Sequence, residues 1–138
     1  EVCSAIKNIY SMIIGAGQSL NASSNLFQKS VIEMKYLTKY FKGKEETTLS
    51  LAGVGDLYVS AAGGRNSKMG SFIGEGLVFS VAKKTKMPEV TVEGAELIFE
   101  IGKKVKEDFD DKKLPLMIAM IDAILEDKKL NIKWENFN

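Results

Sequence analysis

The sequence predicts an all-α domain, and three observations support this prediction. Apolar residues recur at three- and four-residue spacings over most of the 138 residues, which is the period of an amphipathic helix. No two alternating apolar segments are joined in the way that would indicate a pair of strands. The chain is 45% apolar and 27% charged, a composition typical of a globular domain with a single core.

Charge and residue usage exclude several functional classes. The formal net charge of +1 provides no basic field, so we expect no nucleic-acid partner. There is no histidine, which excludes Ser-His-Asp and Cys-His catalysis and any His-based metal site, and we expect no metal. Proton transfer would therefore depend on Lys, Asp, Glu or Tyr. The single cysteine, Cys3, cannot form an internal disulfide and fits a reducing, cytoplasmic setting.

The first predicted helix covers residues 2–20 and is apolar on nearly every face, which indicates a central, buried helix. Residues 8–28 carry no charge, but their Asn, Ser and Gln side chains are too polar for a membrane span. Lys7 is the only charged residue from Val2 through Gln28. Either its stem extends to solvent, or its ammonium is held inside for a function. The pattern alone leaves both interpretations open.

Gly15 and Gly17 lie within this first helix. They are neither preceded by a strand nor followed by the third glycine of a dinucleotide-binding turn. We therefore expect them to permit close helix packing or to end the helix.

Further helices follow in order. Residues 25–41 have an amphipathic pattern with Lys29, Glu33 and Lys35 away from the apolar positions. Lys42-Gly43-Lys44 is expected to end this helix, and Thr47-Thr48 to cap a short turn. The remaining predicted helices are Asp56–Ala62, Ser67–Glu75, Leu77–Lys84, Val92–Lys106 and one from Pro115, a residue favoured in a first turn, through Leu125. A frayed last turn is expected within residues 131–138.

The segment from Ser50 to Asn66 is the strongest candidate for a binding site. It contains four of the twelve glycines, and Asp56 is the only acid between Glu46 and Glu75. Arg65 directly follows a pair of glycines and is expected at a helix N-terminus, where free N–H groups and the helix dipole favour an anion. Its guanidinium fork suits a phosphate or a carboxylate. The alternative is two turns that happen to carry an Asp and an Arg.

Four motifs, in the same order, resemble the C-terminal half of NAD-dependent glycerol-3-phosphate dehydrogenase. The resemblance lies in Ala5-Ile6-Lys7-Asn8 (A-L-K-N in the family), Leu51-Ala52-Gly53-Val54-Gly55-Asp56-Leu57 (L-A-G-[LV]-[GA]-D-L), Gly63-Gly64-Arg65-Asn66 ([GS]-x-R-N) and Val92-Glu93-Gly94-Ala95 (the E-G segment). Ser4-Ala5-Ile6 departs from the more frequent G-A-L.

This resemblance implies a fold and an activity. The whole chain, 1–138, would be a helical substrate-binding domain of the 6-phosphogluconate dehydrogenase C-terminal-like type, without the Rossmann half. The complete enzyme would interconvert dihydroxyacetone phosphate and sn-glycerol 3-phosphate with NAD or NADP, in phospholipid precursor synthesis and carbohydrate metabolism. The cofactor would be bound mostly by the missing half. The resemblance is also compatible with a homodimer.

The family's residue roles transfer onto matching positions. Lys7 matches the catalytic lysine, and Asp56 the acid that works with it. Asn8 matches a neighbour in the substrate site, and Ser60 stands where the family often has Thr. Arg65 and Asn66 match residues that hold the substrate phosphate and face the cofactor, and Glu93 matches a nucleotide contact. An ammonium near the substrate carbonyl can stabilise the developing negative charge and supply a proton. We expect Lys7 within reach of Asp56, facing one cleft.

Two other functions remain open from the sequence. The chain could be the helical domain of another lysine-dependent hydroxy-acid dehydrogenase. It could instead be a non-catalytic helical interaction module, with Lys7 extended to solvent and Asp56 paired structurally with Arg65.

Overall fold

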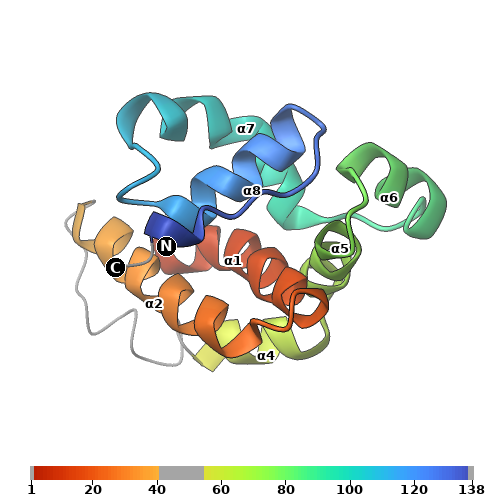
Figure 1. Cartoon of the computed structure of the whole chain (residues 1–138), viewed down its shortest axis with the longest axis horizontal. Helices are drawn as coiled ribbons and strands as arrows, with labels where there is room; N and C mark the ends of the chain where they lie inside the picture. The colour runs from red at the N-terminus through yellow and green to blue at the C-terminus, as the bar shows by residue number, and fades with distance from the viewer. Residues whose placement is uncertain (1, 41–54, 137–138) are drawn as a thin grey trace.

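The computed structural model describes residues 2–40 and 55–136, and all regular structure within them is helical, as predicted. The elements in order are α1 (Val2–Ser19), α2 (Ser23–Tyr40), α4 (Asp56–Gly63), α5 (Arg65–Gly74), α6 (Phe79–Lys86), α7 (Glu93–Asp108), α8 (Pro115–Leu125) and the 3₁₀ turn η2 (Trp134–Asn136). In Figure 1, α7 and α8 lie above α1, α2 and α4 lie below it, and α5 and α6 lie to the right.

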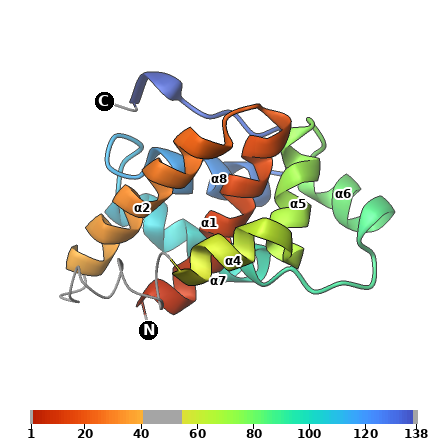
Figure 2. The same cartoon turned by 90° about the horizontal axis from the view of Figure 1, so that it is seen from below.

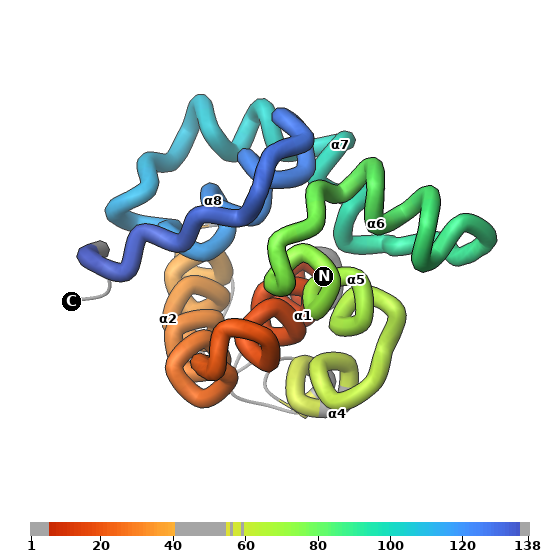
Figure 3. Tube along the Cα trace, turned by 45° about the vertical axis from the view of Figure 1, so that its right-hand side comes forward, coloured from red at the N-terminus to blue at the C-terminus, as the bar shows by residue number. Residues whose placement is uncertain are grey.

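Helix α1 is the centre of the domain, as its nearly uniform apolarity predicts. It packs against α2, α4, α5, α7 and α8, and Figure 3 shows it enclosed between α2 and α5. Ile6, Ile9, Ile13 and Ala16 are buried at the predicted spacing, but Leu20 is exposed because the helix has already ended at Ser19. A central helix of this kind gives its neighbours a common frame, so residues on α1 can meet residues from several elements.

Close contact between α1 and α5 depends on glycine. A Cβ on Gly70 of α5 would lie 1.9 Å from the carbonyl oxygen of Met12, and a Cβ on Gly15 would lie 2.1 Å from the carbonyl oxygen of Ser67. A Cβ on Gly17 would likewise lie 3.0 Å from the Cα of Ser23 at the start of α2. The packing role predicted for Gly15 and Gly17 is therefore confirmed, and the helix continues past both of them.

Helix α2 corrects one prediction. Glu33 was expected away from the apolar face, but its side chain is only 1% exposed. The buried positions of α2 are Leu26, Ser30, Glu33, Met34, Leu37 and Thr38, and the three- and four-residue steps between them place Glu33 on the inner face. A buried carboxyl group must be hydrogen-bonded to be tolerated, and this one is, as described below.

The other boundaries differ from the predictions by a few residues. Helix α6 covers Phe79–Lys86 rather than Leu77–Lys84, and the last turn is confined to η2 among the described residues. Figure 2 shows α4, α5 and α6 following one another along one side of α1. The predictions for Lys42-Gly43-Lys44, Thr47-Thr48 and Leu51–Val54 fall outside the described residues.

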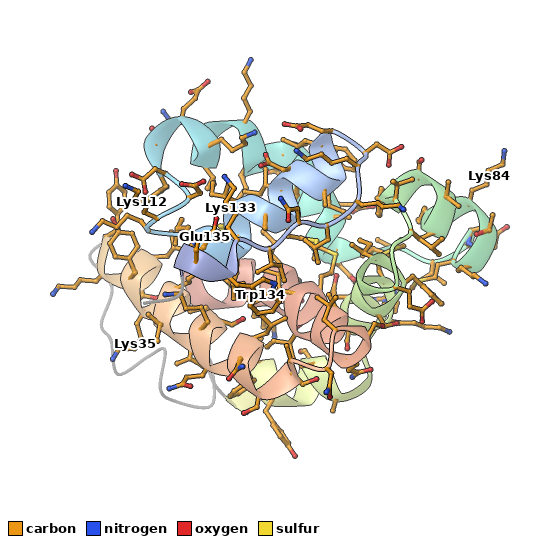
Figure 4. The ribbon with its side chains drawn as sticks, in the orientation of Figure 1. Lys35, Lys84, Lys112, Lys133, Trp134 and Glu135 are labelled. Carbon is orange, nitrogen blue, oxygen red and sulfur yellow. The ribbon has the colours of Figure 1, made fainter. Side chains whose placement is uncertain are left out.

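Charged side chains project from the outer surface of the bundle. Figure 4 shows Lys35 on α2, Lys84 on α6 and Lys112 in the loop before α8, all directed away from the core. By contrast, α8 is buried at nine positions, from Pro115 to Ile124. Within the part of the chain that the structure describes, no helix combines the length and apolarity needed to cross a membrane.

Candidate functional site

The N-termini of α5 and α7 meet, and this places three of the predicted site residues together. Asn66, in the first turn of α5, accepts a hydrogen bond from the backbone N–H of Gly94 in the first turn of α7, at 2.7 Å. Arg65 forms an ion pair with Glu93, the first residue of α7. The sequence predicted both residues in the site, but not this direct pair, which joins positions 28 residues apart.

The first turn of α5 is suited to an anion. Gly64 precedes it in an extended conformation, and as the N-cap residue it provides no side-chain cap. The N–H of Lys68 donates to the carbonyl of Gly64, whereas the N–H groups at the very start of α5 have no partner of this kind within the helix. The Ser67 hydroxyl donates to the carbonyl of Ala61 and thereby ties α5 to α4. Arg65 thus lies at a helix N-terminus, as predicted.

Asn66 and Arg65 differ in how far their side chains are buried. Asn66 is buried, and because its Oδ1 accepts from Gly94, its NH₂ group is the part left to donate to a ligand. The side chain of Arg65 is 57% exposed and that of Glu93 39%, so their ion pair lies in contact with water. An exposed pair of this kind contributes little to stability and can be rearranged at low cost when a ligand arrives.

Helix α1 brings Lys7 and Asn8 to the same corner of the molecule. A Cβ on Gly94 would lie 2.7 Å from the carbonyl oxygen of Asn8 and 3.0 Å from Oδ1 of Asn66. Only glycine allows this approach, which explains why residue 94 is a glycine. The sequence pattern does not predict this contact. Lys7 is half-buried, one residue before Asn8, and its carbonyl accepts a hydrogen bond from the Ser11 hydroxyl.

The contribution of α4 is described in part. The helix begins at Asp56, as predicted. The side chain of Asp56 is not among those that the structure describes, so the predicted contact between Lys7 and Asp56 stays a prediction. Ser60 is half-buried one turn before the end of α4, and its carbonyl accepts the N–H of Gly64. Ser60 therefore helps to hold the turn that leads into Arg65.

Comparison with known proteins identifies the family. The model of the family described as "NAD-dependent glycerol-3-phosphate dehydrogenase C-terminus" matches residues 1–134. The chain belongs to this family. It is also 30% identical over 133 residues to a Campylobacter jejuni protein named glycerol-3-phosphate dehydrogenase [NAD(P)+], and covers 41% of that relative. A relative of the same name from onion yellows phytoplasma is 29% identical over 135 residues, with 40% of its length covered.

Solved structures of family members share the fold. The glycerol-3-phosphate dehydrogenase of Coxiella burnetii superposes with a TM-score of 0.79 at 26% identity, over 99% of this chain and 42% of that one. The yeast enzyme gives a TM-score of 0.78 at 23% identity, over 98% of this chain and 39% of that one, and this likeness shows the fold alone. The chain thus spans about two fifths of the length of the relatives that it matches.

The candidate site is open to solvent at the ion pair between Arg65 and Glu93, whose side chains are both at least partly exposed. Hollows on the described surface lie elsewhere, for example between α6, α7 and α8 beside Phe79 and Phe99, and beside Phe27 and Tyr58. These two hollows are mainly apolar, whereas Arg65, Asn66 and Glu93 carry charged and polar groups that can recognise a ligand. Among the described residues, no group of three His, Cys, Asp or Glu side chains could hold a metal ion.

Proposed function

We propose that residues 1–138 form the substrate-binding domain of a glycerol-3-phosphate dehydrogenase that interconverts dihydroxyacetone phosphate and sn-glycerol 3-phosphate. The observation that carries this proposal is the joined N-termini of α5 and α7, with Arg65 and Asn66 at the start of α5 and Lys7 on the adjacent helix. Family membership supports it, and the relatives bear this activity in their names.

The phosphate binds at the start of α5. Its charge is stabilised by the N-terminal N–H groups of the helix, by the NH₂ of Asn66 and by the guanidinium of Arg65. Because Arg65 is already paired with Glu93, the phosphate either displaces that carboxylate or shares the guanidinium fork with it. Holding the phosphate, which does not react, positions the carbonyl carbon that does react.

Lys7 acts on the carbonyl. Its ammonium stabilises the negative charge that develops on the substrate oxygen and supplies the proton, and Asp56 and Asn8 assist it. The half-buried position of Lys7 supports this role, because the residue projects from a central helix whose place is fixed by close packing with α5. The carbonyl of Ser60 holds the turn before Arg65.

NAD or NADP supplies the hydride when bound, mostly on a second domain. The residues of this chain fit one edge of such a cofactor, because Glu93 offers a half-exposed acceptor for hydroxyl or amide groups next to the cationic Arg65. The open face of the site supports a closing partner of this kind. The complete enzyme is proposed to work in the cytoplasm on a small-molecule substrate, with no metal.

Titration of the 138-residue chain with glycerol 3-phosphate, followed by amide NMR shifts, tests the proposal. We expect saturable shifts at residues 7–8, 64–67 and 93–95, with much weaker effects from glycerol. Dihydroxyacetone phosphate and NADH should not be turned over by the chain alone. Shifts that fail to saturate, or that arise equally with glycerol, would favour the alternative of a non-catalytic interaction module. Preferential binding of an unphosphorylated hydroxy acid would favour another lysine-dependent dehydrogenase.

A further inference from the structure

Glu33 connects three helices from inside the core. Its Oε1 accepts the Tyr10 hydroxyl of α1 at 2.7 Å and the backbone N–H of Met117 of α8 at 3.1 Å, and its Oε2 accepts the N–H of Leu116 at 2.8 Å. Tyr10 is fully buried and Glu33 nearly so.

The carboxyl group completes the N-terminus of α8. Pro115, the first residue of this helix, has no N–H, and the N–H of Ile118 donates to the carbonyl of Leu114. The remaining two donors of the first turn belong to Leu116 and Met117, and Glu33 accepts both. Helix α8 has no side-chain cap at its own N-cap residue, Leu114, so α2 supplies the cap from 83 residues away.

The same group holds the first half of α1 on another side from the glycine contacts. The close contacts with α5 fall on Met12, Gly15 and Ala16, in the second half of the helix, and in the first half Gly94 of α7 closely approaches the carbonyl oxygen of Asn8. Tyr10 lies one turn after Lys7 and projects on nearly the same side of the helix. A hydrogen bond from the Tyr10 hydroxyl to a fixed acceptor therefore restrains the rotation of the helical turn from which Lys7 projects.

We propose that Glu33 is a positioning residue for the substrate site: it holds Tyr10 and the start of α8, and thereby fixes the direction in which α1 presents Lys7. This inference rests on the proposed function of Lys7. The titratable groups that act on Glu33 are Tyr10 on α1 and Lys29 on α2, while α8 contributes backbone donors. Burial raises the pKa of Glu33 to about 7, against the lowering effect of its hydrogen bonds.

Misplacing a catalytic group by a fraction of an ångström changes the rate of the chemical step more than it changes substrate binding. The phosphate subsite at Arg65 and Asn66 lies on α5 and α7, whereas the hydrogen bonds of Glu33 go to α1 and α8. Loss of the Tyr10–Glu33 bond should therefore reduce kcat and leave KM almost unchanged. A merely structural role would instead reduce the amount of folded protein without separating kcat from KM.

The test uses Tyr10→Phe and Glu33→Gln in the complete two-domain enzyme. Tyr10→Phe removes one hydroxyl and keeps the ring, and Glu33→Gln keeps one acceptor oxygen in nearly the same volume. We expect each to lower kcat roughly tenfold, with KM for dihydroxyacetone phosphate within about twofold, and the double variant to be no worse than the more impaired single variant.

Two controls separate the possible outcomes. Ser80→Ala removes an exposed hydrogen bond to Asp127, just beyond the C-terminal end of α8, and should leave kcat unchanged. Lys7→Met should lose at least roughly a hundredfold in kcat. If Lys7→Met is impaired while Tyr10→Phe keeps a normal kcat, the positioning role of Glu33 is wrong. If Lys7→Met itself keeps a normal kcat, the proposed function of Lys7 is wrong, and the inference for Glu33 fails with it.

Discussion

The side-chain oxygen of Asn66 accepts the backbone N–H of Gly94, and this single bond joins the first turns of two helices at the candidate site. It also fixes the orientation of the Asn66 amide. With the oxygen committed to Gly94, the NH₂ group is directed to the remaining side, where an acceptor such as a phosphate oxygen would lie.

Asn66→Asp separates the two roles of this amide. The carboxylate can still accept from Gly94, so the domain should fold with a melting temperature close to that of the parent. The donor is lost and a negative charge takes its place, so KM for dihydroxyacetone phosphate in the complete enzyme should rise about tenfold or more. Asn66→Ala is the matched control, because it leaves the buried Gly94 N–H unpaired and should cost about 1–3 kcal/mol in unfolding free energy. Unchanged KM in the Asp variant would contradict a phosphate at this position.

Arg65→Lys tests the guanidinium fork. A lysine keeps the charge and can still pair with Glu93, but it cannot make two parallel hydrogen bonds to a phosphate. We expect kcat/KM for dihydroxyacetone phosphate to fall about tenfold or more in the complete enzyme, mainly through KM. Steady-state kinetics with unphosphorylated dihydroxyacetone provide the control, since its weak turnover should hardly change. An equal loss with both substrates would show that Arg65 does not recognise the phosphate.

Gly70→Ala tests the contact between α1 and α5. The added methyl group would meet the carbonyl oxygen of Met12 at 1.9 Å, and neither helix can move without disturbing the core. We expect the unfolding free energy, measured by urea titration with circular dichroism, to fall by more than about 3 kcal/mol. At Gly63 of α4 an added Cβ meets nothing within 4 Å, so Gly63→Ala should be neutral or should gain less than about 1 kcal/mol. Similar effects of the two substitutions would mean that α1 and α5 are not in such close contact.

Glu33 makes stability depend on pH. Its folded-state pKa of about 7 lies above the ordinary value of 4.5, so the folded chain retains a proton that the unfolded chain has released. The associated stability is fully present below about pH 4.5 and is lost as pH rises through about 7, by up to about 3 kcal/mol in total.

The comparison of parent and Glu33→Gln isolates this dependence, because the other carboxyl groups titrate equally in both proteins. The unfolding free energy of the parent relative to the variant should decrease from pH 5 to pH 8. A difference that stays constant, or that grows with pH, would show that the folded-state pKa of Glu33 is not raised.

Local patterns predicted the helices and the start of α5, because these features depend on neighbouring residues. Gly63-Gly64 before Arg65 signalled a helix N-terminus, and the nearly uniform apolarity around Lys7 signalled a central helix. Both are confirmed. Local patterns do not predict the hydrogen bond between Asn66 and Gly94, because it depends on how two helix ends come together in space.

The burial of Glu33 follows from a pattern that is present in the sequence. The steps from Leu26 to Ser30, Glu33 and Leu37 follow the helical period, and this places the carboxyl group on the apolar face. Charge alone favours an exposed position, although a buried carboxyl is tolerated when it has donors. Those donors come from Tyr10 and from the start of α8, and no local pattern around residue 33 indicates them.

The cap that α2 provides for α8 affects how the chain folds during its synthesis. A ribosome that adds about 5–20 residues per second needs on the order of ten seconds to proceed from Glu33 to Leu116, 83 positions later. Throughout that interval the carboxylate has no α8 donors and remains hydrated, so α1 and α2 cannot close over it. The apolar surface that α1 and α2 bury against α8 therefore stays exposed until α8 emerges, and this is the surface that a chaperone could bind in that period.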